Sequence, residues 1–389
     1  MSASTPDEGI GHGGLAAAVD DAHVLLTTGA GGVGKTTTAA ALALAAAFRG
    51  RHALVITIDP ARRLAQALGL EGLATEPQPV PLDAPGRLDA MMLDMQSTFD
   101  DLVDRHAATP DRAAAIKDNR IYQTLSASLS GTQEYMAMEK LHELHDRGTW
   151  DLIVVDTPPT RSALDFLDAP ARMTSFLEGR LLRLLLQPAM SAGRGYLRAV
   201  NFGATAFMKV AGKVTGMGVL DDIADFFRAF DGMYDGFKQR AEEVLALLRR
   251  PESRFVVVTS PQPPPLREAR FFVDRLEQEG LHLAGVVVNR LHGAPVGHDP
   301  AELRRAADLL ERSDRDANGP QAVTGATAAG LRLAADLRTI AAREARDVAA
   351  ALVNRSVPLV VHVGRRSGEI HDLPGLEAIA TDLTGPVPD

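Results

Sequence analysis

Short apolar segments rich in β-branched residues recur along the chain, separated by longer stretches of helical character. Several are apolar throughout rather than alternating with polar residues, which is typical of strands covered on both faces. Their alternation with helices predicts an α/β fold built on a doubly wound, mostly parallel sheet. The expected strands are His23–Thr28, Ala53–Ile58, Asp89–Leu93, Leu152–Val155, Phe255–Thr259, Leu283–Val288 and Leu359–Val363.

Two intervals between these strands are too long for simple crossovers, namely Ser97–Gly148 and Pro170–Leu248. Both are dense in Ala, Leu, Phe and Met and have helical character. We expect a single domain over residues 21–380, with a helical insertion subdomain formed by residues 97–148 and 170–248. The stretch His292–Ala335 is expected to be a loop followed by a helix.

The two ends of the chain carry few apolar residues in any regular pattern. Residues 1–20 are acidic and Gly-rich, and residues 381–389 contain two prolines and a glycine. We expect both to be disordered tails. The first also lacks a basic segment followed by an apolar one, so it does not resemble a signal peptide.

Composition narrows the possible functions. The chain has 389 residues, a net charge of −9 and no cysteine, which excludes disulfides, thiolate metal sites and a cysteine nucleophile. The acidic balance argues against a nucleic-acid partner. The strongest apolar spans, Ala39–Phe48 and Leu181–Leu186, are far shorter than the ~20 residues of a membrane helix. We expect a soluble, cytoplasmic protein.

The segment Gly29–Thr36 matches the phosphate-loop motif G-x-x-x-x-G-K-[ST], with an expected strand before it and an expected helix, Thr36–Phe48, after it. Glycines allow backbone N–H groups to turn inward around a phosphate. The strand before the motif and the helix after it argue against a chance match. Lys35 is expected to reach the β- and γ-phosphates, and the Thr36 hydroxyl to bind Mg²⁺ directly. The motif therefore predicts ATP and Mg²⁺ at Gly29, Gly31, Gly32, Val33, Gly34, Lys35, Thr36 and Thr37.

Two aspartates follow expected strands. Asp156 ends Leu152–Val155 and is expected to hold Mg²⁺ through water; the alternative is an aspartate that caps a loop. Asp59 follows Ala53–Ile58 and can orient or deprotonate the water that attacks the γ-phosphate. It can equally be the N-cap of a helix that begins at Pro60, and both roles can hold together.

Taken together, these motifs resemble the arsenite-transport and tail-anchored-protein-targeting ATPases, a family of dimeric P-loop ATPases. The resemblance implies that Asp59 serves hydrolysis and that Asn289 reads adenine. It rests on five segments in order: Gly29–Thr36, similar to the family's Gly-Lys-Gly-Gly-Val-Gly-Lys-Thr; Asp59-Pro60-Ala61, similar to its first switch; Asp156-Thr157-Pro158-Pro159-Thr160, similar to its second; Asn289; and Gly368-Glu369-Ile370, similar to its adenine-side loop.

The resemblance implies an ATP hydrolase that works as a homodimer or as a heterodimer with a paralogous ATPase. Nucleotide-driven closure of the dimer would be coupled to a helical cargo or regulatory subdomain. An alternative function stays open, namely a nucleotide-binding regulatory subunit with little turnover of its own, paired with a lysine-bearing paralogue.

Three departures from the family pattern bear on these expectations. Ala30 stands where the family's signature lysine reaches across the dimer, and Arg161 follows Thr160 where the family commonly has Gly-His. The absence of cysteine removes the thiolates that bind arsenite or clamp zinc, so arsenite transport is not expected.

Weaker signals have plainer explanations. His142 and His145 share a helix face and could bind a metal, but solvated histidines are commoner. Methionines and phenylalanines across Pro170–Phe237 suit an apolar protein segment as cargo, although such residues more often form core. Arginines in the same stretch allow peripheral contact with anionic lipid, although a solvated helix face is the commoner reason for them. Arg62 and Arg63 follow Asp59 and are candidates for positive charge near the phosphates.

Overall fold

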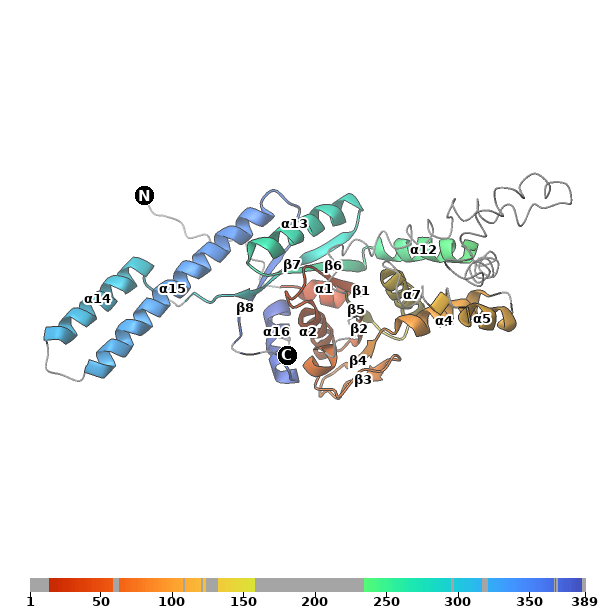
Figure 1. Ribbon diagram of the computed structural model, residues 1–389, viewed down its shortest axis with the longest axis horizontal. Coiled ribbons are helices and arrows are strands. Elements are labelled where there is room, and N and C mark those ends of the chain that lie inside the picture. Colours follow the sequence, from red (N-terminus) through yellow and green to blue (C-terminus); the bar gives the residue numbers. More distant parts are fainter. Residues whose placement is uncertain are drawn as a thin grey trace, which may run out of the picture. The chain divides into compact units, whose positions relative to one another are not determined.

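The structure is a computed structural model. Two compact units are distinguished: Met1–Met92, Thr149–Ala163 and Arg249–Asp389 form the first, and Leu93–Gly148 with Leu164–Leu248 form the second. Figure 1 follows their elements along the chain. The residues that the structure describes are 14–58, 63–107, 109–119, 122–123, 132–157, 234–294, 297–316, 321–366, 368 and 370–386.

The first unit contains, within the described residues, an eight-stranded sheet in the order β3-β4-β2-β5-β1-β6-β7-β8. All neighbouring strands are parallel except β3 and β4. This confirms the predicted mostly parallel α/β fold. The two-residue edge strand β3 was not expected. The strands are β1 (Val24–Thr28), β2 (His52–Thr57), β3 (Gln78–Pro79), β4 (Arg87–Met92), β5 (Leu152–Asp156), β6 (Ser253–Thr259), β7 (His282–Leu291) and β8 (Val360–Gly364).

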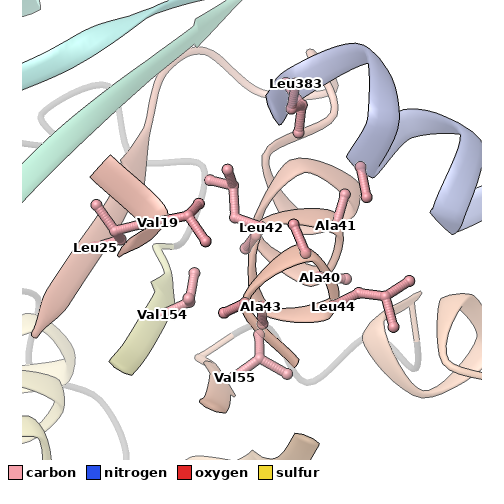
Figure 2. Packing of buried hydrophobic residues seen from close by; sticks show 14 of the residues in the cluster. Val19, Leu25, Ala40, Ala41, Leu42, Ala43, Leu44, Val55, Val154 and Leu383 are labelled. Atoms are coloured by element: carbon pink, nitrogen blue, oxygen red, sulfur yellow. The ribbon is translucent and has the colours of Figure 1, made fainter. Parts of the chain in front are cut away.

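Helix α2 (Lys35–Phe48) is the centre of the core. Every residue from Thr38 to Ala47 is buried, and most of them are alanine. Short side chains let the helix pack closely against the sheet on one side and against α16 (Leu373–Thr384) on the other. Figure 2 shows Val55 and Val154 of the strands and Leu383 of α16 around this helix. Packing on both sides therefore fixes the position of the start of α2, which follows β1 in the chain.

Side chains alternate along the edge strand β8 between a buried face and a more exposed face. Val361 and Val363 pack with the core around α2, whereas Val360 and His362 line an apolar cavity with α15 (Gln321–Leu352). Burial lowers the pKa of His362, which favours its neutral form. Helix α13 (Pro263–Gln278) packs against β6 and β7. The short helix α3 (Arg63–Ala67) packs against α2.

The expectation of disordered tails is wrong for part of each end. Helix α1 (Ala16–Asp21) buries Val19, and the preceding Leu15 donates its N–H to the carbonyl of Leu383 at 2.7 Å. Residues 381–384 belong to α16, whose buried positions Leu376, Ile379 and Leu383 recur at helical spacing. The Asp372 side chain caps this helix by accepting the N–H of Gly375. Both segments are short, and the apolar positions of α16 begin before residue 381, so the composition of the tails alone does not show this periodicity.

The loop followed by a helix that we expected from His292 onward is present, but two helices, α14 (Pro300–Asp316) and α15, follow the loop rather than one. Asp299 accepts the N–H of Ala301 at 2.7 Å, and the Glu302 carboxylate accepts the N–H of Asp299 at 3.3 Å. This is a capping arrangement with proline at the first helical position. The helix is rich in charge and pairs with α15 through ion pairs such as Arg304–Asp336 at 2.8 Å, so it carries only a weak apolar signal.

The described part of the second unit is helical. Its helices are α4 (Met95–His106), α5 (Pro110–Lys117), α7 (Thr132–Arg147) and α12 (Tyr234–Leu248). Glu139 of α7 is buried, and Arg240 of α12 donates to its carboxylate at 2.9 Å, which ties the two long insertions together. Residues 158–233 lie outside the described residues, so the extent of the helical subdomain stays a prediction.

No helix in the described part of the chain has the length and apolar character needed to cross a bilayer.

We expect Leu383→Ala to lower the free energy of unfolding by about 2–5 kcal/mol, because the side chain is fully buried between α16 and the core and its removal leaves a cavity. Urea denaturation of the full chain would measure this. Leu309→Ala is the matched control, since Leu309 is 65% exposed and its truncation should change stability by less than about 0.5 kcal/mol. Equal effects of the two substitutions would contradict the packing described for α16.

Candidate functional site

The candidate site is the loop that joins β1 to α2. Strand β1 lies between β5 and β6, so the loop begins where the carboxyl ends of central parallel strands meet. Gly29 follows β1 with a φ of 146°, and a Cβ atom on it would lie 2.0 Å from the carbonyl oxygen of Val258 in β6. No larger residue fits this close approach, which fixes the point where the loop leaves the sheet.

The middle of the loop exposes its backbone. Gly31 and Gly32 are exposed, while the Val33 side chain is buried in the core and anchors the loop. Gly32 and Gly34 have φ of 75° and 101°, a region that L side chains rarely adopt. Backbone conformation therefore favours glycine at both positions, of which the motif itself prescribes Gly34.

Lys35 is the first residue of α2 and is 6% exposed. Its ammonium donates to the carbonyl oxygens of Gly29 and Ala30, each at 3.0 Å, so the cation lies inside the curve of the loop. Gly34 is the N-cap residue, so no side chain caps the helix, and its first turn contains no acidic residue. Thr37, also in the first turn, is half-buried. Backbone N–H donors, the helix dipole and a lysine are thus collected at one place, an arrangement suited to a polyanion.

Asp156, the last residue of β5, is 1% exposed. One of its carboxylate oxygens accepts the hydroxyl of Thr36 at 2.7 Å and the hydroxyl of Thr57 at 3.0 Å. The three residues come from β5, α2 and β2, and β2 borders β5 in the sheet. The structure therefore brings Thr36 and Asp156 together, as the sequence motifs predicted for a shared metal site.

This donor set fits Mg²⁺. A hydroxyl and a carboxylate are hard oxygen ligands of the kind that Mg²⁺ prefers, and the ion usually retains waters and takes the remaining ligands from a phosphate. In the arrangement described, the Thr36 hydroxyl would bind the ion directly and Asp156 would hold it through water. The metal would supply charge neutralisation of the phosphates.

Asn289 lies near the end of β7 and contacts the loop. Its side-chain amide donates to the carbonyl oxygen of Val33 at 2.9 Å, and its carbonyl accepts the N–H of Arg290 at 2.8 Å. Arg290 has a φ of 64°, one of the two positive values recorded for non-glycine residues in the described part of the chain. The sequence analysis assigned Asn289 to the base and did not anticipate this contact with the loop.

Several predicted residues cannot be placed. Asp59, Arg62 and the segment from Pro158 to Arg161 lie outside the described residues, so their roles stay predictions. The preceding Ile58 donates its N–H to the Asp156 carbonyl at 3.4 Å. Arg63 is the exposed first residue of α3.

Thr57 is a site residue that sequence reasoning missed. It is buried and shares the Asp156 oxygen with Thr36. Thr157 similarly donates to the carbonyl of Thr27 at 2.7 Å and joins β5 to β1. The available signal was their position at the carboxyl ends of β2 and β5, where a buried hydroxyl needs a hydrogen-bond partner and the site supplies one.

The histidines considered for a metal lie in the second unit. His142 is 2.9 Å and His145 is 3.7 Å from carboxylate oxygens of Asp146. Within the residues that the structure describes, no group of three or more histidines and acidic residues is arranged to hold a metal ion.

Comparison with known proteins identifies the kind of chain to which this site belongs. A family model described as anion-transporting ATPase matches residues 22–307. An uncharacterized protein of Streptomyces coelicolor is 38% identical over 176 residues, which is 44% of this chain and 42% of that protein. ATPase get3 of Aspergillus terreus is 34% identical over 143 residues, or 36% of this chain and 41% of its own length. The chain thus spans about two fifths of these two relatives.

Longer alignments are found at lower identity. ATPase GET3 of Malassezia globosa is 25% identical over 270 residues, covering 69% of this chain and 72% of that protein. A putative arsenical pump-driving ATPase of Aquifex aeolicus is 22% identical over 280 residues, covering 69% and 63% of the two chains. These names describe the relatives.

We expect Gly29→Ala to destabilise the protein strongly. The backbone conformation alone penalises alanine by about 1–3 kcal/mol, and the new methyl group would overlap the Val258 carbonyl. Thermal unfolding of the full chain would measure the loss. Gly72→Ala is the matched control, because a Cβ atom there meets open space. If Gly29→Ala were as stable as the control, the close approach of the loop to β6 would be wrong.

Proposed function

The chain belongs to the anion-transporting ATPase family, and on that premise we propose that it binds Mg²⁺–ATP at residues 29–36 and hydrolyses it. The observation that carries the proposal is the hydrogen bond between Thr36 and Asp156, 2.7 Å long. It links the hydroxyl of the phosphate loop to a buried carboxylate on the neighbouring strand. A Gly-rich turn without function would not need a carboxylate buried beneath it.

The proposed chemistry divides among four residues, of which Asp59 lies outside the described part of the chain. Lys35 moves from the carbonyls of Gly29 and Ala30 to the β- and γ-phosphates, because phosphate oxygens are stronger acceptors than amide carbonyls. Thr36 directly and Asp156 through water would hold Mg²⁺, which would neutralise charge on the phosphates. Asp59 orients the attacking water.

The connections of the chain favour coupling between nucleotide and the helical unit. Helix α7 ends at Arg147 and leads into β5, which ends at Asp156, and α12 ends at Leu248 and leads into β6. These two strands flank β1. A change at the phosphates therefore has short covalent routes to both insertions.

We propose that the cargo of the insertions is an apolar protein segment. The Met- and Phe-rich segment that motivates this cargo, Pro170–Phe237, falls almost wholly outside the described residues. Peripheral contact with a membrane rests on arginines in the same segment.

A second function, that of a regulatory subunit with weak turnover, is favoured by one observation. Ala30 occupies the position of the family's signature lysine, and its side chain is buried with the core. A homodimer would then lack a cation that acts across the interface, whereas a lysine-bearing paralogue would supply one. We propose dimerisation in either case, at a cytoplasmic location.

We expect Lys35→Ala to weaken binding of Mg²⁺–ATP by roughly tenfold to a hundredfold, since each charge-assisted hydrogen bond contributes about 1.5–3 kcal/mol. Stability without nucleotide should fall only slightly, because the ammonium donates to neutral carbonyl oxygens of the loop, those of Gly29 and Ala30, at 3.0 Å. Isothermal titration calorimetry with thermal unfolding would separate the two effects. Lys117→Ala, a lysine of the second unit, is the control. Undiminished ATP binding by Lys35→Ala would refute the proposed site.

We expect Ala30→Lys to raise steady-state ATP turnover of the purified chain, because a cation acting across a dimer interface is typically worth about 10³–10⁵ in rate. Ala30→Met controls for side-chain length without charge and should not increase the rate. ATPase assays of the three proteins, each checked for its oligomeric state, would decide. Rapid turnover by the unmodified chain that Ala30→Lys does not change would eliminate the regulatory alternative.

A further inference from the structure

Asn289 and the phosphate loop fit each other in a way that base recognition does not require. The Asn289 side-chain nitrogen lies 2.9 Å from the Val33 carbonyl oxygen. A Cβ atom on Gly34 would lie 2.3 Å from that same nitrogen. The amide therefore occupies the space that the missing side chain of Gly34 leaves, and it donates to the peptide group immediately before it.

The orientation of this peptide group matters for anion binding. A trans peptide is planar, with its N–H pointing opposite to its C=O. Because the Val33 carbonyl is turned toward Asn289, the N–H of Gly34 points to the other side. The next carbonyl, that of Gly34, accepts the N–H of Thr38 at 2.9 Å. The Lys35 ammonium lies 3.0 Å from the carbonyl oxygens of Gly29 and Ala30, but in the proposed function it moves to the phosphates, so it does not hold these carbonyls when the ligand is bound. The carbonyls of Val33 and Gly34 thus have donors that fix which way the N–H groups of these two peptides face.

Asn289 is itself held in place. Its carbonyl oxygen accepts the N–H of Arg290 at 2.8 Å, and the left-handed conformation of Arg290, with φ of 64°, accompanies that contact. A side-chain amide has two N–H donors and two acceptor positions. One donor and one acceptor position are used here, so the others remain available to a base.

We infer that Asn289 is a positioning residue for the phosphate loop, one that orients the Gly34 N–H toward a bound phosphate chain whether or not a base is present. The inference rests on the proposed function, since it concerns the same nucleotide site. Lys35 is tethered to the carbonyls within its own loop, whereas Asn289 fixes the loop from a separate strand. Strand β7 therefore takes part in phosphate binding as well as carrying a base contact.

The test uses a ligand without a base. We expect Asn289→Ala to weaken binding of Mg²⁺–tripolyphosphate and of Mg²⁺–ATP by a similar factor of about five to ten, the affinity equivalent of one hydrogen bond. The Asn289→Asp variant should bind both ligands more weakly than the Asn289→Ala variant, because the substitution places a carboxylate against the Val33 carbonyl. Displacement of a fluorescent ATP analogue from the full chain would measure both ligands down to millimolar affinity.

The control is Asn354→Asp, an exposed asparagine with φ of 59° at the end of α15, which should bind both ligands as the unmodified chain does. Thermal unfolding of each variant without ligand should remain within a degree or two of the unmodified chain, which separates loop positioning from loss of fold. If Asn289→Ala weakened ATP alone, or if tripolyphosphate failed to displace the analogue from the unmodified chain, the inference would be wrong. If the unmodified chain bound no ATP, the proposed function itself would fail.

Discussion

A carboxylate buried almost completely under the phosphate loop constrains the arrangement of the whole sheet. Asp156 is 1% exposed, and an ionised carboxylate in such a place is destabilising unless hydrogen bonds compensate it. Two hydroxyls do so, Thr36 at 2.7 Å and Thr57 at 3.0 Å. They reach it only if β2, β5 and α2 are in register, and the pairing of Thr57 with Asp156 across the two strands provides that register. The same contacts that satisfy the charge also assemble the proposed Mg²⁺ ligands.

The alanine-rich buried residues of α2 also help to bring Thr36 and Asp156 together. Close packing of α2 against both the sheet and α16 places Thr36 within hydrogen-bonding distance of Asp156, and longer side chains would move the helix outward. Gly29 imposes a comparable limit at the end of β1, where the backbone approaches Val258. Core packing therefore determines the geometry of the site in this protein, because the residues that fill the core also set the position of the loop.

How much the sequence predicted depended on whether a feature is local. The parallel sheet was predicted from continuous apolar runs, and the phosphate loop from a motif with the expected strand and helix on either side. Both signals lie in residues that are neighbours in the sequence. The contact between Asn289 and Val33 joins residues far apart in sequence, and no local pattern encodes it. Thr57 was missed for the same reason. From the sequence we expected one helix after the loop at His292 and did not separate α14 from α15, and we assigned the last residues of α16, 381–384, to a tail.

The order of the strands has a consequence for how the chain is made. Strand β1, the most central of the apolar strands, is synthesised first, but its neighbours β5 and β6 end at Asp156 and Thr259. At typical rates of about 5–20 residues per second, β6 leaves the ribosome roughly 10–50 seconds after β1. Throughout that interval the β1 segment and the alanine-rich helix after it have no complete sheet to pack against. The nascent chain must therefore remain soluble while the apolar β1 segment has no neighbouring strands to pair with.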